Sequence, residues 1–189
     1  MNFLRQALAA LRLLLVMTVL LGIAYPVVIT GIAQVVAPVQ ANGSLLTNRG
    51  GEVVGSALIG QTVNGPEWFQ ARPSASDYSG ETSGGSNLSP VSTDQLDARA
   101  KRETDLRAAN PDAVGPVPED ALTASASGLD PHISVAYALW QVPRVAKARG
   151  LDFARLTALS SAATEPAPLG FLGQDGVNVT RLNLALAAG

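Results

Sequence analysis

No charged residue lies between Arg12 and Arg49, and the apolar part of this stretch covers residues 13–37. A helix of that length spans about 37 Å, which exceeds the ~30 Å hydrocarbon core of a bilayer. Backbone polar groups inside lipid must be satisfied within the segment itself, and a helix does this. The stretch therefore predicts one transmembrane helix over residues 13–37, in which Pro26 removes a backbone donor and introduces a kink.

Charges around this helix predict its orientation. Arg5 and Arg12 precede it without any acidic residue, and the dozen residues after it carry only Arg49. The positive-inside rule then places residues 1–12 in the cytoplasm and residues 38–189 on the extracytoplasmic side of the membrane. The alternative is a signal peptide cleaved after Val39-Gln40-Ala41, but the apolar run exceeds the 7–15 residues of an ordinary signal peptide. Whether the helix is a lone anchor or packs against a partner's helices stays open.

The composition of the outer part excludes several classes of protein. Residues 38–189 carry all 15 acidic and 11 of the 13 basic residues, a net charge of −4, so no basic field for nucleic acid exists. The chain has no cysteine and one histidine. These counts exclude a disulfide scaffold, a cysteine nucleophile and a cysteine-ligated or multi-histidine metal site, and we predict no metal.

Turn and cap signals predict a small mixed α+β domain after the anchor. Two short strands are expected over residues 56–61 and 67–72, followed by a long irregular loop over 73–90. Helices are expected from a Ser92 cap to Asn110, from a cap at Ser134 or Asp130 to a break at Pro143, and over residues 144–149 up to Gly150. Two more are expected over residues 153–160 with Asp152 as the cap and from 179 onwards with Asn178 as the cap. The helix that begins at Ser92 would carry ion pairs Asp97–Lys101 and Glu103–Arg107.

Three groups of residues resemble chemical sites. Ser83-Gly84-Gly85-Ser86 has the glycines of a phosphate-binding loop but lacks its lysine, so a turn is the better interpretation. Ser127, Asp130 and His132 are the residue types of a nucleophilic triad, but no Gly-x-Ser-x-Gly motif surrounds a serine here. His132 is instead expected to fix a loop by hydrogen bonds. A basic helix end, Arg144, Lys147 and Arg149, is expected to complement the helix dipole.

Several longer motifs carry a resemblance to one family. They are Gly55-Ser-Ala-Leu-Ile-Gly-Gln61, Arg72-Pro-Ser-Ala75, Ser83-Gly-Gly-Ser-Asn87, the segment 123–134, Gln141-Val-Pro-Arg-Val-Ala-Lys-Ala-Arg149, Val177-Asn-Val179 and Leu182-Asn-Leu-Ala-Leu186. In order and spacing they resemble the KdpC family, the C subunits of Kdp potassium-transporting P-type ATPases. The resemblance runs from the anchor to the C-terminus, and residues 42–54 match it only loosely.

The resemblance implies a subunit of an ATP-driven potassium importer in the inner membrane. Its partners would be the channel-like subunit KdpA, the ATPase subunit KdpB and the small subunit KdpF, besides membrane lipid. The family's C subunit is described as a catalytic chaperone that raises the ATP affinity of KdpB, and Gln141 matches the nucleotide position. No firmly bound cofactor is implied, ATP is possible by resemblance, and potassium is the transported ion.

The orientation predicted from charge opposes direct ATP contact, because nucleotide domains lie in the cytoplasm. We therefore expect a subunit that is not catalytic alone and that assembles and stabilises the complex. Loop residues expected to face a partner are Ser83, Gly84, Gly85, Ser86, Asn87, Asp130, His132 and Ser134. Two alternatives are an anchored extracytoplasmic hydrolase that uses Ser127 or Ser83 with His132, and a stand-alone membrane-tethered binding module.

Overall fold

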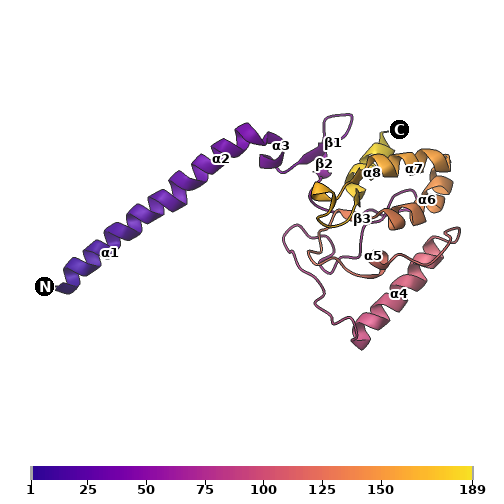
Figure 1. Ribbon diagram of the computed structural model, residues 1–189, viewed down its shortest axis with the longest axis horizontal. Coiled ribbons are helices and arrows are strands. Elements are labelled where there is room, and N and C mark those ends of the chain that lie inside the picture. Colours follow the sequence, from indigo (N-terminus) through magenta and orange to yellow (C-terminus); the bar gives the residue numbers. More distant parts are fainter. Residues whose placement is uncertain (1, 189) are drawn as a thin grey trace. The chain divides into compact units, whose positions relative to one another are not determined.

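The computed structural model describes residues 2–188, and the chain divides into two units, Met1–Ser44 and Leu45–Gly189. The first unit is helical: α1 (Asn2–Val19), a π-helical turn (Leu20–Ala24), α2 (Tyr25–Val36) and the short α3 (Pro38–Ala41) (Figure 1). Over Phe3–Val36 it is long and apolar enough to cross a membrane, and no other helix within residues 2–188 is. The prediction of one helix able to span a membrane is confirmed, and this helix begins before residue 13, where we expected it to start. Its orientation stays a prediction.

The π-helical turn lies directly before the proline of this helix. The backbone N–H of Tyr25 donates to the carbonyl of Leu20, five residues back instead of four. Pro26 has no N–H, and its ring would collide with the carbonyl of Gly22 in a regular α-helix. One wider turn relieves this conflict and lets the helix continue to Val36.

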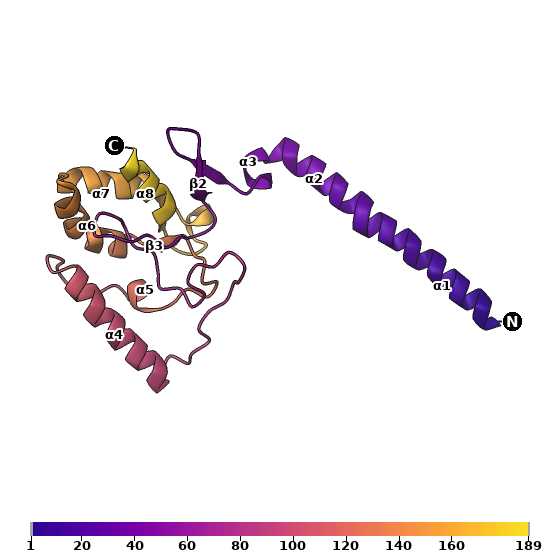
Figure 2. The same ribbon diagram turned by 180° about the vertical axis from the view of Figure 1, so that it is seen from behind.

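The second unit contains two small antiparallel sheets and five helices (Figures 1 and 2). The strands β1 (Leu45–Thr47) and β2 (Val53–Ser56) form a hairpin. In the second sheet β5 (Gly176–Asn178) lies between β3 (His132–Ser134) and β4 (Thr164–Glu165). The helices are α4 (Thr93–Ala109), α5 (Glu119–Leu122), α6 (Val135–Arg149), α7 (Phe153–Ala162) and α8 (Val179–Ala187), and a 3-10 turn covers Pro168–Gly170. The α+β prediction is confirmed.

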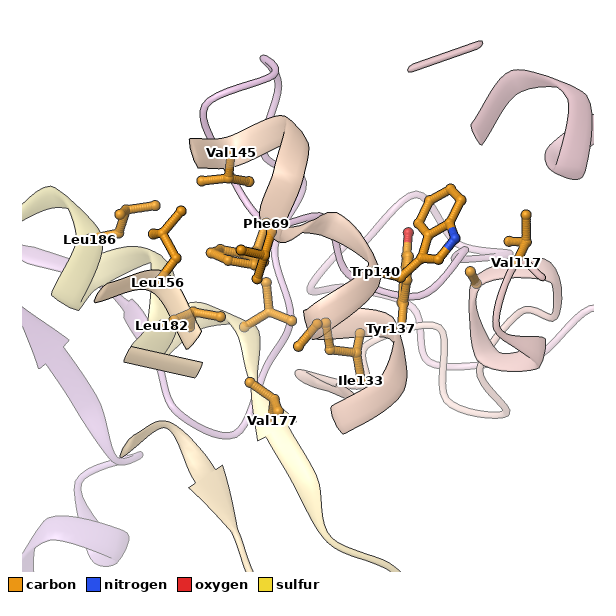
Figure 3. Packing of buried hydrophobic residues seen from close by; sticks show 14 of the residues in the cluster. Phe69, Val117, Ile133, Tyr137, Trp140, Val145, Leu156, Val177, Leu182 and Leu186 are labelled. Atoms are coloured by element: carbon orange, nitrogen blue, oxygen red, sulfur yellow. The ribbon is translucent and has the colours of Figure 1, made fainter. Parts of the chain in front are cut away.

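The core gathers around α6 and the second sheet. Figure 3 shows Phe69 and Val145 from above, Leu156 and Leu182 from the side, and Val177 from β5 converging on one apolar centre. Toward the other end of α6, the rings of Tyr137 and Trp140 lie 6.4 Å apart. Fully burying one such side chain stabilises the fold by about 1.5–3 kcal/mol, so this cluster dominates the stability of the domain.

Several predicted caps are confirmed. The Ser92 hydroxyl accepts a bond from the Gln95 N–H at the start of α4, and the helix ends at Ala109 before Asn110. Asn178 and Ser134 cap α8 and α6 in the same way. Asp152 occupies the cap position of α7 without a side-chain bond. The Glu103–Arg107 pair is present, whereas Lys101 pairs with Asp105 at 2.6 Å instead of Asp97.

Two predictions about elements were wrong. Helix α6 runs unbroken through Pro143, where we expected a break, because Val142 and Val145 beside it are both fully buried and this burial outweighs one lost backbone bond. The predicted strands over 56–61 and 67–72 are also not strands: β2 ends at Ser56, and residues 67–72 pair with no strand. The partners of this second segment are side chains.

Candidate functional site

Two buried amides take the place of a neighbouring strand for residues 69 and 70. Asn183 of α8 accepts a hydrogen bond from the Phe69 N–H at 2.9 Å and donates to its carbonyl at 2.8 Å. Gln141 of α6 does the same for Gln70, at 2.7 and 3.0 Å. Each amide thus satisfies both polar groups of one residue, as a strand in a sheet would. We call Asn183 and Gln141 the amide brackets.

The bracket at Gln141 has no free hydrogen-bonding group directed at solvent. The side chain is 0% exposed, and its Oε1 also accepts a bond from the Arg144 guanidinium at 2.7 Å. A nucleotide could contact this amide only after the bonds to Gln70 were broken. Nucleotide binding at Gln141 stays a prediction, and the geometry gives this residue a structural role.

Arg144 fixes the preceding part of the same segment. It is 8% exposed and donates to Asn110 Oδ1 at 2.7 Å and to the carbonyls of Pro66 and Trp68 at 2.6 and 2.9 Å. Burial lowers the pKa of the guanidinium, and nearby Tyr137 opposes that shift. The helix-dipole role of Arg144 stays a prediction, and the structure adds a second role, because its charge is turned inward and shared among carbonyl oxygens.

The other two cations of this helix end have different partners. Arg149 lies over the ring of Trp68, 4.2 Å from its centroid, and donates to the Glu67 carbonyl at 2.8 Å. Lys147 is exposed and pairs with Asp112 at 2.8 Å. Arg144, Arg149 and the amide brackets together hold residues 66–70 against α6 and α8.

The serine- and glycine-rich loop is fastened to a second loop that lies far away in the sequence. The Gly84 N–H and the Ser83 hydroxyl both donate to the Ser127 carbonyl, at 2.8 and 3.1 Å. A Cβ on Gly85 would lie 3.1 Å from the Ala126 carbonyl oxygen, so only glycine fits without displacement. The predicted turn was wrong, because residues 82–89 form no turn and neither Gly84 nor Gly85 has a positive φ; the close approach of Ala126 accounts for Gly85 alone. Ser83, Ser86 and Asn87 remain exposed at the surface.

Gly128 closes the same junction from the other side. Its carbonyl accepts a bond from Ser74 at 2.6 Å, and its φ of 68° lies in the region that favours glycine. Arg72 pairs with Asp130 at 3.3 Å and donates to the Thr123 carbonyl at 3.4 Å. Residues 72–76, 83–85 and 123–130 therefore form one cross-linked polar surface.

His132 connects that surface to the second sheet. Its Nε2 lies 2.9 Å from Glu165 Oε2, and its Nδ1 lies 3.7 Å from Asp130 Oδ1. The ring crosses the middle strand at Gly176, where a Cβ would lie 3.3 Å from His132 Cβ. Asp130 raises the pKa of His132, partial burial opposes the shift, and Glu165 adds to it. Burial would raise the pKa of Asp130, but bonds from His132 and the Arg72 charge outweigh it and hold that pKa below its ordinary value.

This geometry gives the hydrolase alternative no support. Both ring nitrogens of His132 face carboxylates, and a nucleophilic triad requires one of them to face a serine hydroxyl. The hydroxyl of Ser127 instead accepts a bond from the Leu129 N–H at 3.1 Å, and that of Ser83 donates to a carbonyl. His132 has the loop-fixing hydrogen bonds that we expected of it.

Ser134 has a structural role in addition to any contact with a partner. Its hydroxyl caps α6 by accepting a bond from the Tyr137 N–H at 3.0 Å and donates to Asp120 at 2.8 Å. Asp120 also accepts a bond from the Ser134 N–H at 2.7 Å. One carboxylate of α5 thus fixes the point at which β3 becomes α6.

Within residues 2–188 no group of three or more metal-ligating side chains is suitably placed to hold a metal ion. The surface has a shallow apolar groove of about 500 Å³ between α6 and the segment before α5, lined by Val114, Pro116, Leu139, Trp140 and Phe153 among others. Its lining has no ionisable group, so it offers no acid or base for catalysis. The described surface is suited to binding and to holding loops in place.

Sequence reasoning missed three residues that organise this surface: Glu165, Arg72 and Asn183. Glu165 stands in a two-residue strand, and Asn183 stands in an apolar helix where a polar residue at a core position was the available signal. Arg72 lies inside a quoted motif, but nothing local points to its partner 58 positions away.

Comparison with known proteins agrees with the motifs. The family described as "KdpC: K+-transporting ATPase, c chain" matches residues 7–188. The potassium-transporting ATPase KdpC subunit of Rhodospirillum rubrum is 52% identical over 185 residues, covering 97% of this chain and 95% of that protein. KdpC subunits of Caulobacter vibrioides and Myxococcus xanthus are each 50% identical, covering 100% and 95% of this chain and 94% and 86% of theirs. The chain therefore belongs to the KdpC family of potassium-transporting ATPase subunits.

Proposed function

We propose that this chain is a non-catalytic accessory subunit that assembles and stabilises a Kdp complex for ATP-driven potassium import. Its partners are the channel-like KdpA, the ATPase KdpB and the small KdpF, and potassium is the ion that the complex transports. The apolar helix anchors the chain in the inner membrane, and residues 38–189 form an extracytoplasmic domain. The charge asymmetry around the helix supports this orientation.

The proposal depends chiefly on the burial and the hydrogen bonds of Gln141. Its amide is fully buried and its two polar atoms bind Gln70 and Arg144. A residue that contacts a nucleotide needs an exposed donor or acceptor, and this one has neither. We therefore assign Gln141 to the stability of the domain. An effect of this subunit on ATP affinity would then be transmitted through the assembled complex.

A labelling experiment tests the orientation. The chain contains no cysteine, so single cysteines introduced at exposed positions of this subunit can be compared in intact cells. Ser86→Cys lies in the outer domain and Gln6→Cys in α1, and both positions are exposed. A membrane-impermeant maleimide is expected to label Ser86→Cys in intact cells and Gln6→Cys only after lysis. The reverse pattern would place the domain in the cytosol and overturn the proposal.

A binding measurement tests the nucleotide alternative without altering any residue. A ligand that binds only the native state raises its unfolding free energy by RT ln(1 + [L]/Kd). Millimolar Mg-ATP is expected to leave the urea midpoint of the full chain in detergent unchanged. A saturable rise with ATP, absent with added sulfate, would contradict the assignment of Gln141 and support a nucleotide site.

A further inference from the structure

The loop between β4 and β5 exposes three large apolar side chains within four residues. Leu169, Phe171 and Leu172 are 80%, 73% and 51% exposed, and residues 166–174 contain no charged residue. Single exposed apolar residues are common on proteins, but adjacent ones on a projecting loop mark interaction surfaces. We call these three residues the apolar tip.

The loop has a defined conformation that keeps the apolar tip away from the core. The Gly170 N–H donates to the Ala167 carbonyl at 2.9 Å, and the Leu172 N–H donates to the Pro168 carbonyl at 3.1 Å. Leu169 adopts a φ of 56°, a left-handed conformation that is unfavourable for a leucine. No burial within this chain compensates for that cost, because the side chain is exposed.

The base of the loop is tied down on both strands. Glu165 ends β4 and binds His132 at 2.9 Å, with Arg181 3.6 Å away on its other side. Asp175 precedes β5 and accepts a bond from the Ala167 N–H at 2.9 Å. A fixed base and a fixed turn reduce the entropy lost on binding, which is how a preorganised contact gains affinity.

Charge indicates which kind of partner meets the tip. Lipid-binding loops place Lys, Arg, Trp or Tyr beside their apolar residues, and residues 166–174 have none of these. The residues that flank the loop are the acids Glu165 and Asp175, in a domain of net charge −4. The tip therefore offers no cation or interfacial aromatic to lipid headgroups, whereas an apolar socket on a protein requires neither.

A protein socket also suits the size of the tip. Three side chains are too few for a free-standing interface, which buries about 800 Å² on each partner. The membrane anchor removes that requirement, because it holds this subunit beside its partners at high effective concentration. A second copy is a poor occupant, since two chains outside the complex would need the free-standing interface that three side chains are too few to supply.

We propose that Leu169, Phe171 and Leu172 insert into an apolar socket on another subunit of the potassium-transporting ATPase. This inference rests on the proposed function and names the surface through which this subunit holds the complex together. The loop would exchange its exposed apolar area for burial in that socket.

Site-specific photocrosslinking in the assembled complex tests the docking. A benzophenone amino acid at position 171 is expected to form a covalent adduct with another subunit, and the same probe at Val91, which is 84% exposed, is expected to form at least tenfold less. Adducts with lipid alone, adducts between two copies of this chain, or equal yields at both positions would each overturn the docking.

A loss-of-contact variant provides the second measurement. The triple change of Leu169, Phe171 and Leu172 to Ser is expected to lower co-purification with the other subunits by about tenfold or more, while Val91→Ser leaves it unchanged. The urea midpoint of the variant chain alone should equal that of the wild type, since the tip contributes nothing to the core. Undiminished co-purification refutes the docking and leaves the proposed function intact. Failure of the wild-type chain to co-purify refutes the proposed function itself.

Discussion

Replacing Gln141 by alanine tests the amide bracket directly. The change removes three hydrogen bonds, those to the Gln70 N–H, to the Gln70 carbonyl and from Arg144. Each orphaned buried group costs about 1–3 kcal/mol, and the low end applies at Gln70 because that residue is only partly buried. Adding a small cavity in place of the removed side chain, we expect a loss of about 4 kcal/mol in unfolding free energy. For a domain of this size, that loss corresponds to a fall of about 10 °C in Tm.

Urea unfolding of the full chain in a mild detergent measures this loss. Both tryptophans, Trp68 and Trp140, lie in the outer domain, so their fluorescence reports its unfolding alone. Gln61→Ala is the matched control at an exposed position and should change the unfolding free energy by less than about 0.5 kcal/mol. Gln141→Glu should lose less than Gln141→Ala, because its carboxylate can still accept from Gln70 and Arg144. A loss below about 1 kcal/mol in Gln141→Ala would refute the reasoning.

Two further changes test the sheet and its junction with α6. The folded-state pKa of His132 is raised above 6.5. The protonated imidazole therefore adds to the free energy of unfolding at low pH, and this stabilisation is lost as the pH rises through the folded-state pKa. The stability difference between the wild type and His132→Gln, measured by urea unfolding, should therefore shrink from about pH 6 to about pH 9, and a difference that is constant or grows with pH contradicts the Glu165 contact. Ser134→Ala loses the helix cap and the bond to Asp120, and should destabilise the domain by about 2 kcal/mol in the same assay. Ser134→Thr, which keeps the hydroxyl, should recover most of that loss, and equal losses in both variants would exclude the cap as the cause.

Local signals predicted the parts of the fold that local physics controls. The apolar helix, the caps at Ser92, Ser134 and Asn178, and the glycine end of α6 at Gly150 follow from the chemistry of a few neighbouring residues. The break at Pro143 was not observed, because the burial that carries α6 through the proline comes from distant parts of the chain. Residues 56–61 and 67–72 were taken for two strands because each is a short run with apolar residues bounded by turn signals. For residues 69 and 70 the pairing partners are instead side chains on α6 and α8.

The candidate site was predicted in part for the same reason. His132 as a loop-fixing residue required only short-range reasoning. The turn expected at Gly84-Gly85 is absent, because this segment is held by bonds to the distant Ser127 carbonyl. Gln141 was singled out as a nucleotide candidate by resemblance and Arg144 as part of a basic helix end, but their common target is a segment more than 70 positions earlier. Periodicity cannot locate such partners, since no sequence pattern near position 70 or position 141 indicates that the two residues are in contact.

The π-helical turn before Pro26 has a geometric consequence for the anchor. A turn of this kind inserts one residue, which rotates everything beyond it by about 100° around the helix axis. Side chains of α1 and α2 that would lie on one face of an uninterrupted helix thus point to different sides of the helix axis. The two leaflet halves of the anchor can then meet two different neighbours, one through the stripe that includes Thr18 and the other through the stripe that includes Gly31.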